Sequence, residues 1–370
     1  MSYGKPGRRV VVSEFGTDPL DAIAKYLTVE AQEPPDPASL GPTDVVIAVK
    51  SAAIGWVDLL MSSGQYQHMA SPPYCPGLEY SGEVAWTGTE VTHVSVGDAV
   101  WADGMLTGPR SIGDYQEYGG WASYAVAPGA AVAPLPTALS FDQGCNFSGY
   151  ETAYHALIHR GRLAAGEVVL IHGSTGTTGL AAVQMAKLVG ATVIATGRNP
   201  DKLRVVTEQG ADHVVRVTDD DGAPRRFRED VKALTGGRGV DVVYDPVGGD
   251  ISLESLRCVR FGARFLVVGW AATPLVAKGK GERGAPNANV LPTNLIMMKS
   301  LDVLGCPAAI SVHHDPSIRG KRLEALGAWF EAGKLAPHVS RVYPMSKIGE
   351  ALREKWQSRH VGCYVLHPGE

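Results

Sequence analysis

The segment 167–197 constrains the fold of this chain more than any other. It reads EVVLIHGSTGTTGLAAVQMAKLVGATVIATG: an apolar run, a glycine-rich turn, an amphipathic stretch and a second apolar run. This order predicts a strand, a tight turn, a helix and a parallel strand, which together form a βαβ unit. Gly173 permits the turn, Gly176 lets the backbone approach a pyrophosphate, and Gly179 lets the helix pack on the strand.

The glycine-rich turn predicts a binding site for a dinucleotide. The helix that follows it offers free N–H groups and the positive end of its dipole to phosphate. No Lys-Ser or Lys-Thr pair follows the last glycine, which excludes a mononucleotide P-loop. A glycine-rich turn without a ligand is the alternative. The residues predicted to bind the cofactor here are Gly173, Ser174, Gly176, Thr177, Thr178 and Gly179.

The end of the second apolar run indicates which dinucleotide is bound. Sites selective for NAD usually have Asp or Glu at this point, which accepts hydrogen bonds from the ribose 2′-hydroxyl. This chain has Gly197 and Arg198 instead, with Lys202 soon after, and two cations suit the 2′-phosphate of NADP. In the alternatives, both cations are solvated residues at a helix start, or Asp201 is the missing acid, although it lies late in the segment. We therefore predict NADPH as the cofactor.

The rest of the chain predicts two domains, the number also expected for 370 residues. Residues 1–148 contain short apolar runs separated by glycine and proline, which indicates a β-rich, barrel-like domain. Residues 149–307 alternate Val- and Ile-rich runs with amphipathic stretches that end at glycine, which predicts a doubly wound parallel sheet. Residues 308–370 return to mixed structure. Two stretches, 103–120 and 273–292, are predicted to be long loops.

Composition excludes several classes of protein. Hydrophobic residues make up 45% and charged residues 19% of the chain, which is typical of a globular protein. A net charge of −4 argues against a nucleic-acid-binding surface. No apolar run approaches the about 20 residues of a membrane span, and the start of the chain has no signal-peptide pattern. Five scattered cysteines without a C-x-x-C pair favour a reducing compartment, so we expect a cytoplasmic protein.

Several motifs spread over nearly the whole chain carry a resemblance to a known family. They include SAAIGWVDLLMSSGQY, PPYCPGLEYSGEV, the glycine-rich segment, GVDVVYDPVGGD and LPTNLIMMKSLDVLG. The chain resembles the medium-chain dehydrogenase/reductase superfamily, specifically its zinc-free quinone-oxidoreductase-like branch. The resemblance implies an α/β fold with a GroES-like β-rich catalytic domain (residues 1–148 and 308–370) and a Rossmann domain that binds NADPH (residues 149–307). It also implies a homodimer, with SLDVLG as the outer strand of the cofactor sheet.

The chain departs from its relatives at two positions of the catalytic domain. It has Gly55 and Leu78 where zinc-containing relatives carry Cys and His ligands, and Glu79 alone makes no zinc site, so we expect no metal. The zinc-free branch usually has Asn at the position of Gly55, and its absence leaves the proton donor open. The resemblance implies catalytic-site roles for Tyr66, whose phenol can hydrogen-bond a carbonyl oxygen, and for Asp58. Core packing of Tyr66 and a structural role for Asp58 are the alternatives.

The resemblance implies further cofactor contacts outside the glycine-rich turn. Lys202 matches a lysine that meets the 2′-phosphate, and Arg216 supplies a charge where relatives often have a nearby tyrosine. Arg359 matches an arginine that reaches the cofactor phosphate, although a plain surface arginine is an equal alternative. The implied contacts in this group are Thr152, Gly197, Arg198, Lys202, Arg216, Gly269, Asn294, Gly305, Cys306 and Arg359.

These expectations describe an NADPH-dependent reductase that needs no zinc. It would deliver hydride to a quinone or to the C=C bond of an α,β-unsaturated carbonyl. One alternative is an enoyl-thioester reductase, in which Lys278, Lys280 and Arg283 of the second long loop meet acyl-carrier or coenzyme A phosphates. Another is a non-catalytic NADPH-binding protein. The expected partner is a small-molecule substrate rather than nucleic acid or a membrane, and nothing in the sequence names that substrate.

Overall fold

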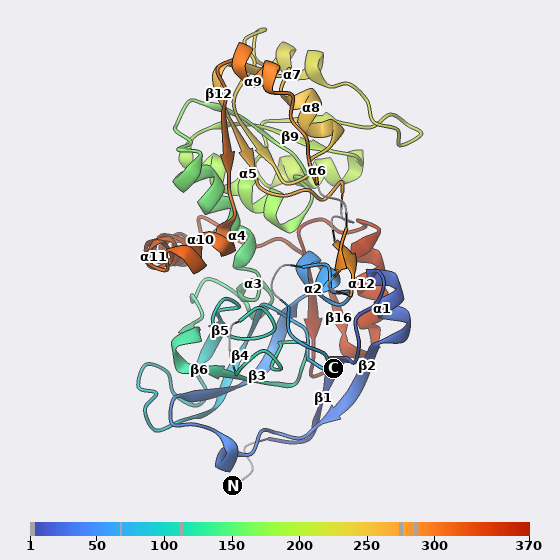
Figure 1. The fold of residues 1–370 in the computed structure, drawn as a ribbon. Coiled ribbons are helices and arrows are strands. Elements are labelled where there is room, and N and C mark those ends of the chain that lie inside the picture. Colours follow the sequence, from blue (N-terminus) through green and yellow to red (C-terminus); the bar gives the residue numbers. More distant parts are fainter. Residues whose placement is uncertain (1–3, 67–68, 112–113, 274–276, 281, 285–286) are drawn as a thin grey trace. The chain divides into compact units, whose positions relative to one another are not determined.

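The structure, a computed structural model, describes residues 4–66, 69–111, 114–273, 277–280, 282–284 and 287–370. The chain divides into two compact units, which Figure 1 colours along the sequence. The first unit comprises Met1–Phe147, Ala277–Ala285 and Val339–Glu370, and the second comprises Ser148–Val276 and Pro286–His338. Each unit has its own sheet and its own core.

The first unit is built on a seven-stranded sheet. The strands lie in the order β16-β17-β3-β4-β5-β7, and β6 pairs with β3. The β16–β17 pair is parallel, whereas the other neighbours are antiparallel. The strands of the unit are β1 (Gly7–Val12), β2 (Leu27–Gln32), β3 (Asp44–Ala53), β4 (Tyr80–Thr87), β5 (Ala99–Ala102), β6 (Tyr124–Pro128), β7 (Val132–Pro134), β13 (Ala277–Gly279), β14 (Glu282–Arg283), β16 (Val339–Pro344) and β17 (Cys363–His367). Its helices are α1 (Pro19–Lys25), α2 (Trp56–Met61), α3 (Phe141–Gly144) and α12 (Ile348–Trp356), with short 3-10 turns η1 (Pro37–Ser39), η2 (Gly129–Ala131) and η5 (Met345–Lys347).

The core of the first unit follows from the period of its strands. In β3, Val45, Ile47 and Val49 alternate along the strand and belong to one buried cluster. Val84 of β4 and Val100 of β5 join the same cluster from neighbouring strands. Val46, on the other face of β3, is also fully buried, and β-branched side chains pack well on a pleated surface, which explains why a segment so rich in Val and Ile forms the central strand.

The second unit is a doubly wound α/β domain. Its six parallel strands lie in the order β10-β9-β8-β11-β12-β15, so the order reverses between β8 and β11. The predicted fold class is confirmed. In such sheets ligands bind at the carboxyl ends of the strands near that reversal. The strands are β8 (Val168–Ile171), β9 (Thr192–Gly197), β10 (His213–Arg216), β11 (Val240–Asp245), β12 (Val259–Val267) and β15 (Asp302–Gly305). The helices are α4 (Ser148–Ala153), the π-helix η3 (Tyr154–Arg160), α5 (Thr177–Val189), α6 (Pro200–Glu208), α7 (Arg228–Leu234), α8 (Asp250–Ser255), α9 (Thr293–Met298), α10 (Ala308–His314) and α11 (Ser317–Glu331).

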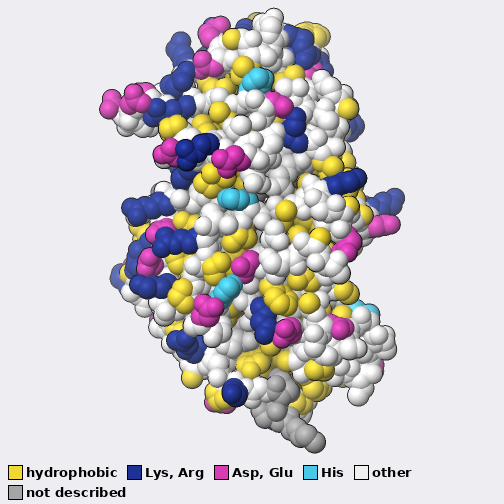
Figure 2. Space-filling view, turned by 180° about the vertical axis from the view of Figure 1, so that it is seen from behind, with side chains coloured by type: hydrophobic (Ala, Val, Ile, Leu, Met, Phe, Trp, Pro, Cys, Tyr) yellow, Lys and Arg dark blue, Asp and Glu magenta, His cyan; other side chains and the backbone are white. Residues whose placement is uncertain are grey.

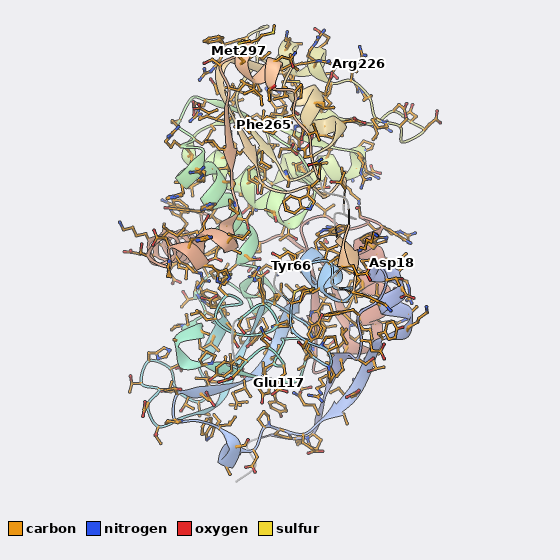
Figure 3. All side chains as sticks on the ribbon, viewed as in Figure 1. Asp18, Tyr66, Glu117, Arg226, Phe265 and Met297 are labelled. Carbon is orange, nitrogen blue, oxygen red and sulfur yellow. The ribbon has the colours of Figure 1, made fainter. Side chains whose placement is uncertain are left out.

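The central strands β8, β9 and β11 of the second unit are buried over nearly their whole length, whereas the edge strands β10 and β15 are largely exposed. Leu170, Ile194, Val243 and Phe265, from four different strands, are fully buried in one cluster, and Figure 3 labels Phe265 within this sheet. A strand covered by helices on both sides needs apolar residues at successive positions. That requirement explains the near-continuous apolar runs of the sequence.

Helices α10 and α11 cluster with the second unit, which includes Pro286–His338. An ion pair between Arg319 of α11 and Glu151 of α4, 3.2 Å apart, joins them to that unit. The amide of Gln184 also donates a hydrogen bond of 2.9 Å to the carbonyl of Ala336. These contacts join residues far apart in the sequence, so local pattern could not reveal them.

The predicted loop 273–292 contains regular structure. Part of it forms the antiparallel pair β13–β14, which clusters with the first unit although the residues on either side belong to the second. The backbone N–H of Lys280 donates a hydrogen bond of 2.6 Å to the carbonyl of Ser63. A Cβ at Gly279 would lie 3.0 Å from the same carbonyl oxygen, so the strand approaches this segment closely. The side chain of Arg283 lies outside the described residues.

The surface carries charges of both signs. Figure 2 shows Lys and Arg side chains interspersed with Asp and Glu over the face that it displays, in keeping with the small net charge of −4. Among the helices in the described part of the chain, none is long and apolar enough to cross a membrane.

Candidate functional site

The glycine-rich turn of the second unit joins β8 to α5 as the sequence predicted. Gly173 follows β8 with φ = 58°, a conformation that L-residues with side chains rarely adopt. The N–H of Gly176 donates a hydrogen bond of 3.0 Å to the carbonyl of Gly173 and closes the turn. The hydroxyl of the buried Ser174 donates to the carbonyl of Thr196 in β9 at 2.8 Å. Ser174 therefore anchors the turn to the neighbouring strand.

The other two glycines differ in what surrounds them. A Cβ at Gly179 would overlap the carbonyl oxygen of Gly173, so this position requires glycine for close packing of the helix. A Cβ at Gly176 would meet only that oxygen, at 3.4 Å, so the protein itself has room for it. Gly176 is the N-cap of α5, and the first N–H groups of a helix have no partner within it. The space at Gly176 therefore fits the approach of a phosphate group to the N-terminus of α5.

Three cationic residues meet beside the tips of β9 and β10. Burial and the nearby charge of Arg198 lower the pKa of Lys202. The Nε of Arg216 donates a hydrogen bond of 3.2 Å to the carbonyl of Arg198, and its Nη1 lies 2.6 Å from the carboxylate of Asp220. Asn199 caps α6: its Oδ1 accepts a hydrogen bond of 3.2 Å from the N–H of Lys202. This contact holds Lys202 in the first turn of the helix. The strand tip thus presents cations where NAD-selective sites present an acid.

Gly197 explains why β9 ends so close to its helix. A Cβ at this position would lie 2.9 Å from the Cδ2 of Leu203 in α6. A bulkier residue would push the first turn of α6 away from the strand. The glycine at the position of the usual acid therefore also serves the packing of the βα turn.

A buried polar network lies at the end of β11, and the sequence reasoning missed it. The carboxylate of Asp245 accepts hydrogen bonds from the N–H of Val247 at 2.8 Å and of Gly248 at 3.0 Å, and also from the hydroxyl of Ser252. Asn289 donates to that hydroxyl at 2.8 Å. The signal was present as the acid of YDPVGG, which directly follows a buried apolar run. The network holds the turn after β11 at the same edge of the sheet as the glycine-rich turn.

Four other predicted cofactor contacts, Thr152, Gly269, Gly305 and Cys306, lie on or just after elements near the carboxyl ends of the strands. Gly269 follows β12, where a Cβ would lie 3.0 Å from the carbonyl oxygen of Pro246. Gly305 ends β15, and burial raises the pKa of the Cys306 thiol that follows to about 12. Thr152 lies on α4. This helix packs closely on the residue that follows the glycine-rich turn: a Cβ at Gly149 of α4 would lie only 3.1 Å from the side chain of Thr177.

Two predicted contacts are exposed side chains on other elements. Asn294 lies exposed near the start of α9. The residue after α9, Lys299, donates a hydrogen bond of 2.9 Å to the carbonyl of Val259, the first residue of β12. α9 therefore runs to the amino end of the strand, away from the glycine-rich turn. Arg359 belongs to the first unit, where it lies exposed after α12.

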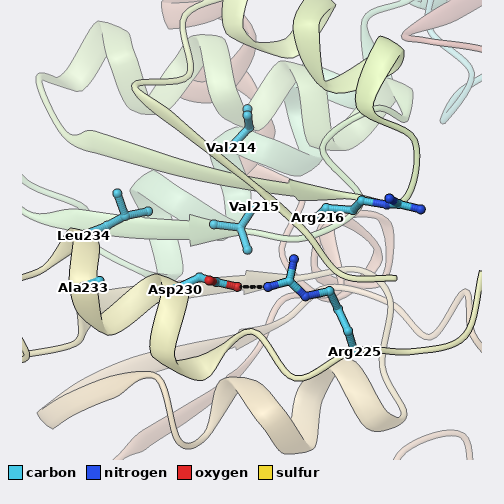
Figure 4. Close-up of a pocket in the computed structure, with 7 residues that line it drawn as sticks. All are labelled: Val214, Val215, Arg216, Arg225, Asp230, Ala233 and Leu234. Atoms are coloured by element: carbon cyan, nitrogen blue, oxygen red, sulfur yellow. Dashed lines mark hydrogen bonds and ion pairs between the residues drawn. The ribbon is translucent and has the colours of Figure 1, made fainter. Parts of the chain in front are cut away.

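The second unit also has a pocket between β10 and α7, with a volume of about 350 Å³ (Figure 4). Arg225 and Asp230 form an ion pair across it. None of the predicted residues of the glycine-rich turn lines it; the residues that line it are Val214, Val215, Arg216, Arg225, Asp230, Ala233 and Leu234.

In the first unit, Asp58 makes the contacts of a structural acid. One carboxylate oxygen accepts hydrogen bonds from the N–H groups of Gly77 at 3.0 Å and Leu78 at 3.1 Å. The other accepts from the N–H of Gly55 at 3.1 Å. Burial raises the pKa of Asp58 to about 6, although these hydrogen bonds lower it. Both oxygens are engaged by backbone, which favours the structural alternative over a catalytic role.

Gly55 and Asp58 fit each other closely. A Cβ at Gly55 would lie 2.5 Å from the Oδ2 of Asp58, so any other residue would displace the carboxylate from its hydrogen bond. Glycine at position 55 therefore leaves room for the carboxylate of Asp58. Leu78 is buried and Glu79 is half-buried beside them. Within the described ranges, no three His, Cys, Asp or Glu side chains are grouped so that they would hold a metal ion.

Tyr66 lies in the segment that follows α2 and is half-buried (Figure 3). The turn before it is set by Gly64, which has φ = 71°, and by the N–H of Gln65, which donates to the carbonyl of Leu60 at 2.9 Å. Among the described residues, no hydrogen bond engages the hydroxyl of Tyr66. Its phenol can therefore donate to a ligand.

Lys355 is a second residue that sequence reasoning missed. It is 3% exposed on α12, and burial lowers the pKa of its ammonium group to about 8, while Cys363, Asp58 and Glu79 raise it. The stacked rings of Trp56 and Trp356, 5.3 Å apart, join α12 to α2. The spacing of the sequence could have revealed its burial, because Lys355 continues the helical pattern of the other buried residues of α12, which are Ile348, Ala351 and Leu352.

Comparison with known proteins agrees with this geometry. Two family models match the chain, "Alcohol dehydrogenase GroES-like domain" at residues 41–137 and "Zinc-binding dehydrogenase" at residues 177–310. The quinone oxidoreductase-like protein 2 homolog of Nematostella vectensis is 31% identical over 366 residues, which cover 98% of this chain and 89% of that protein. The human quinone oxidoreductase is 28% identical, with 83% of each chain covered. The solved Escherichia coli quinone oxidoreductase, in complex with NADPH, has a TM-score of 0.77 and 24% identity, and the match covers 98% of this chain and all of that one.

The chain belongs to the medium-chain dehydrogenase/reductase superfamily, whose members are oxidoreductases that bind a nicotinamide cofactor. Within that superfamily it belongs to the quinone oxidoreductase branch. The family that the sequence analysis named is confirmed.

Proposed function

We propose that this oxidoreductase uses NADPH to reduce a quinone or the C=C bond of an α,β-unsaturated carbonyl, without zinc. The observation that carries the proposal is the tip of β9, where Gly197 replaces the acid of NAD-selective sites and Arg198, Lys202 and Arg216 gather beside it. When bound, NADPH would supply hydride from C4 of its nicotinamide ring. The protein would then supply binding, orientation and a hydrogen-bond donor.

The second unit fits the cofactor through its backbone and its cations. The pyrophosphate would lie over Gly176 against the first N–H groups of α5, where the structure leaves room. Arg198 and Lys202 would bind the 2′-phosphate, with Arg216 holding the backbone of Arg198 in place. A charge-assisted hydrogen bond contributes about 1.5–3 kcal/mol, so two such contacts support a preference on the order of a hundredfold or more for NADPH over NADH. We propose backbone contacts at Gly269, Gly305 and Cys306 and a contact at Thr152, while Asn294 and Arg359 stay predictions.

The first unit supports reduction without a metal. Gly55 and Leu78 stand where zinc-containing relatives have ligands, and neither has a metal-binding side chain. The phenol of Tyr66 would donate a hydrogen bond to the substrate oxygen as negative charge develops on it, and water would protonate the α-carbon. Asp58 would act indirectly, because it holds the backbone turn around Gly77.

A screen of NADPH consumption tests the proposal. Quinones, alkyl enones, 2-haloacrylates and enoyl thioesters are offered with NADPH and, in parallel, with NADH. We expect oxidation of NADPH by a quinone or an enone, with a much higher Michaelis constant for NADH. Replacement of Arg198 and Lys202 by Ala should raise the Michaelis constant for NADPH about a hundredfold and leave that for NADH nearly unchanged. Arg226→Ala, at an exposed arginine of the same unit (Figure 3), is the matched control.

Each outcome of the screen has a defined meaning. Equal use of both cofactors by the unmodified protein would contradict the assignment of NADPH. Activity with enoyl thioesters alone would favour the enoyl-thioester reductase, and inactivity with every acceptor would favour a non-catalytic binding protein. About one zinc per chain by elemental analysis, with activity lost to chelators, would contradict metal independence.

We also propose a cytoplasmic homodimer. β15 is the last strand of the six-stranded sheet, so pairing of two such strands would extend the sheet and cover open N–H and C=O groups. All five cysteines are buried and none forms a disulfide bond, which is in keeping with a reducing compartment. Sedimentation that gave only a monomer at micromolar concentrations would count against the dimer.

A further inference from the structure

Thr196 of β9 is hydrogen-bonded to both neighbours of Gly173, the first glycine of the glycine-rich turn. The Nδ1 atom of His172 lies 2.8 Å from the Oγ1 of Thr196, and the hydroxyl of Ser174 donates a hydrogen bond of 2.8 Å to the carbonyl of Thr196. All three side chains are buried within the second unit. Neither His172 nor Thr196 is a proposed cofactor contact.

These contacts begin where the pairing of the two strands ends. The register of β8 with β9 stops at Ile171 and Ala195, directly before the contacts of Thr196. A Cβ at Gly197 would lie 3.4 Å from the side chain of Thr175, so the tip of β9 also lies against the glycine-rich turn. Side-chain hydrogen bonds therefore continue the attachment of the turn to the strand beyond the backbone ladder.

The direction of each hydrogen bond around His172 follows from its partners. The Oγ of Ser255 lies 2.6 Å from Nε2 of His172 and 2.7 Å from the carbonyl oxygen of Ile251. A carbonyl only accepts, so the hydroxyl of Ser255 donates to it and accepts from the Nε2–H of the ring. Burial lowers the pKa of His172 to about 4, so the ring is neutral at pH 7 and carries a single N–H. Nδ1 is therefore an acceptor, and the hydroxyl of Thr196 donates to it.

Thr196 is thus held on two sides. Its hydroxyl donates to His172, and the hydrogen bonds continue through Ser255 to the helix α8. Its carbonyl oxygen accepts from Ser174 in the glycine-rich turn. Because His172 is fully buried, removal of the Thr196 hydroxyl would leave Nδ1 without a donor among the described residues, and an unsatisfied buried acceptor is costly. The present position of Thr196 relative to the turn is the one that satisfies these polar groups together.

The proposed cofactor requires a fixed spacing between the turn and the strand tip. The pyrophosphate and the 2′-phosphate of NADPH are attached to the same ribose, so their two binding regions must match one spacing, whereas NADH has no 2′-phosphate. Thr196 directly precedes Gly197 and Arg198. We propose that Thr196, held by His172 and Ser174, is a positioning residue that sets this spacing and thereby the selectivity for NADPH. This inference rests on the proposed function.

Fluorescence titration with NADPH and with NADH tests the inference. Thr196→Val keeps the shape of the side chain and removes the hydroxyl, and we expect it to raise the dissociation constant for NADPH about tenfold, the equivalent of one lost hydrogen bond, with that for NADH nearly unchanged. Thr196→Ser keeps the hydroxyl and should bind both cofactors as the unmodified protein does. Thr192→Val, at the other end of β9, is the matched control and should leave both dissociation constants unchanged.

The ratio of the two dissociation constants separates positioning from a purely structural role, which would lower the unfolding midpoint without changing the ratio. If Thr196→Val keeps the ratio of the unmodified protein, this inference is wrong and the proposed function stands. Equal affinity of the unmodified protein for both cofactors would contradict the proposed function and this inference with it. If Thr196→Val does not fold, a long-range ¹H–¹⁵N spectrum of the unmodified protein at pH 7 decides. It should show the ring proton of His172 on Nε2, and a proton on Nδ1 would overturn the inference.

Discussion

Replacement of Lys355 by Met is expected to stabilise this protein below pH 8. Lys355 is 3% exposed, and burial lowers the pKa of its ammonium group from 10.5 to about 8. The change of about 2.5 pKa units corresponds to about 3 kcal/mol at 1.36 kcal/mol per unit, which is the cost of keeping the charged amine in the folded protein at pH 7. Met has a similar length and no charge, so the variant avoids this cost.

The sign of the effect follows from proton binding. Between pH 8 and pH 10.5 the folded protein has released the proton of Lys355 while the unfolded chain keeps it. The unfolded state binds more protons in this range, so the stability of the unmodified protein rises with pH there. The advantage of Lys355→Met should therefore be full below pH 8 and should disappear by about pH 10.5.

Urea unfolding at pH 6.5, 7.5, 8.5 and 9.5 measures this difference. Tryptophan fluorescence is a suitable probe because Trp356, the neighbour of Lys355 on α12, stacks on Trp56 of the same unit. Lys347→Met, at an exposed lysine of that unit, is the control and should show little pH-dependent change. A loss of stability in Lys355→Met that is equal at pH 6.5 and pH 9.5 would refute the reasoning, because it would mean that the ammonium group is well compensated in the folded protein.

Three further predictions concern the two proposed binding regions. Gly176→Ala should leave the midpoint of thermal unfolding nearly unchanged but raise the dissociation constant for NADPH, measured by fluorescence titration, at least tenfold. Gly179→Ala should also lower the unfolding midpoint, because only a Cβ at Gly179 overlaps the backbone of Gly173. Gly55→Ala should lower the free energy of unfolding by about 1–3 kcal/mol, because it breaks the hydrogen bond from the N–H of Gly55 to Asp58. On an Asp58→Ala background the same change should cost much less. If the two changes are additive in this double-mutant cycle, Gly55 and Asp58 are not energetically coupled. Tyr66→Phe should reduce enone turnover by about tenfold to a hundredfold with NADPH affinity unchanged, and steady-state kinetics with unaltered enone turnover would make Tyr66 a wall of the site.

The sequence alone determined the parts of this protein that depend on short-range pattern. The alternation of apolar runs and amphipathic stretches predicted the doubly wound sheet, because a strand covered on both faces must be apolar throughout. The spacing of Gly173, Gly176 and Gly179 predicted the turn between β8 and α5, because the positive φ of Gly173 and the close backbone packing at Gly179 both require glycine. The family followed from the same local motifs and was confirmed.

Only the tertiary structure decided which distant residues share an environment. It placed α10 and α11 in the second unit, through contacts between residues more than 150 positions apart. It brought the carboxylate of Asp58 within hydrogen-bond distance of three backbone N–H groups, two of which come from a segment about 20 residues away. It also buried Lys355 and Arg322, whose charges are ordinary in sequence and costly in the interior. Burial and pairing depend on the packing of whole elements, and for that reason no local pattern contains them.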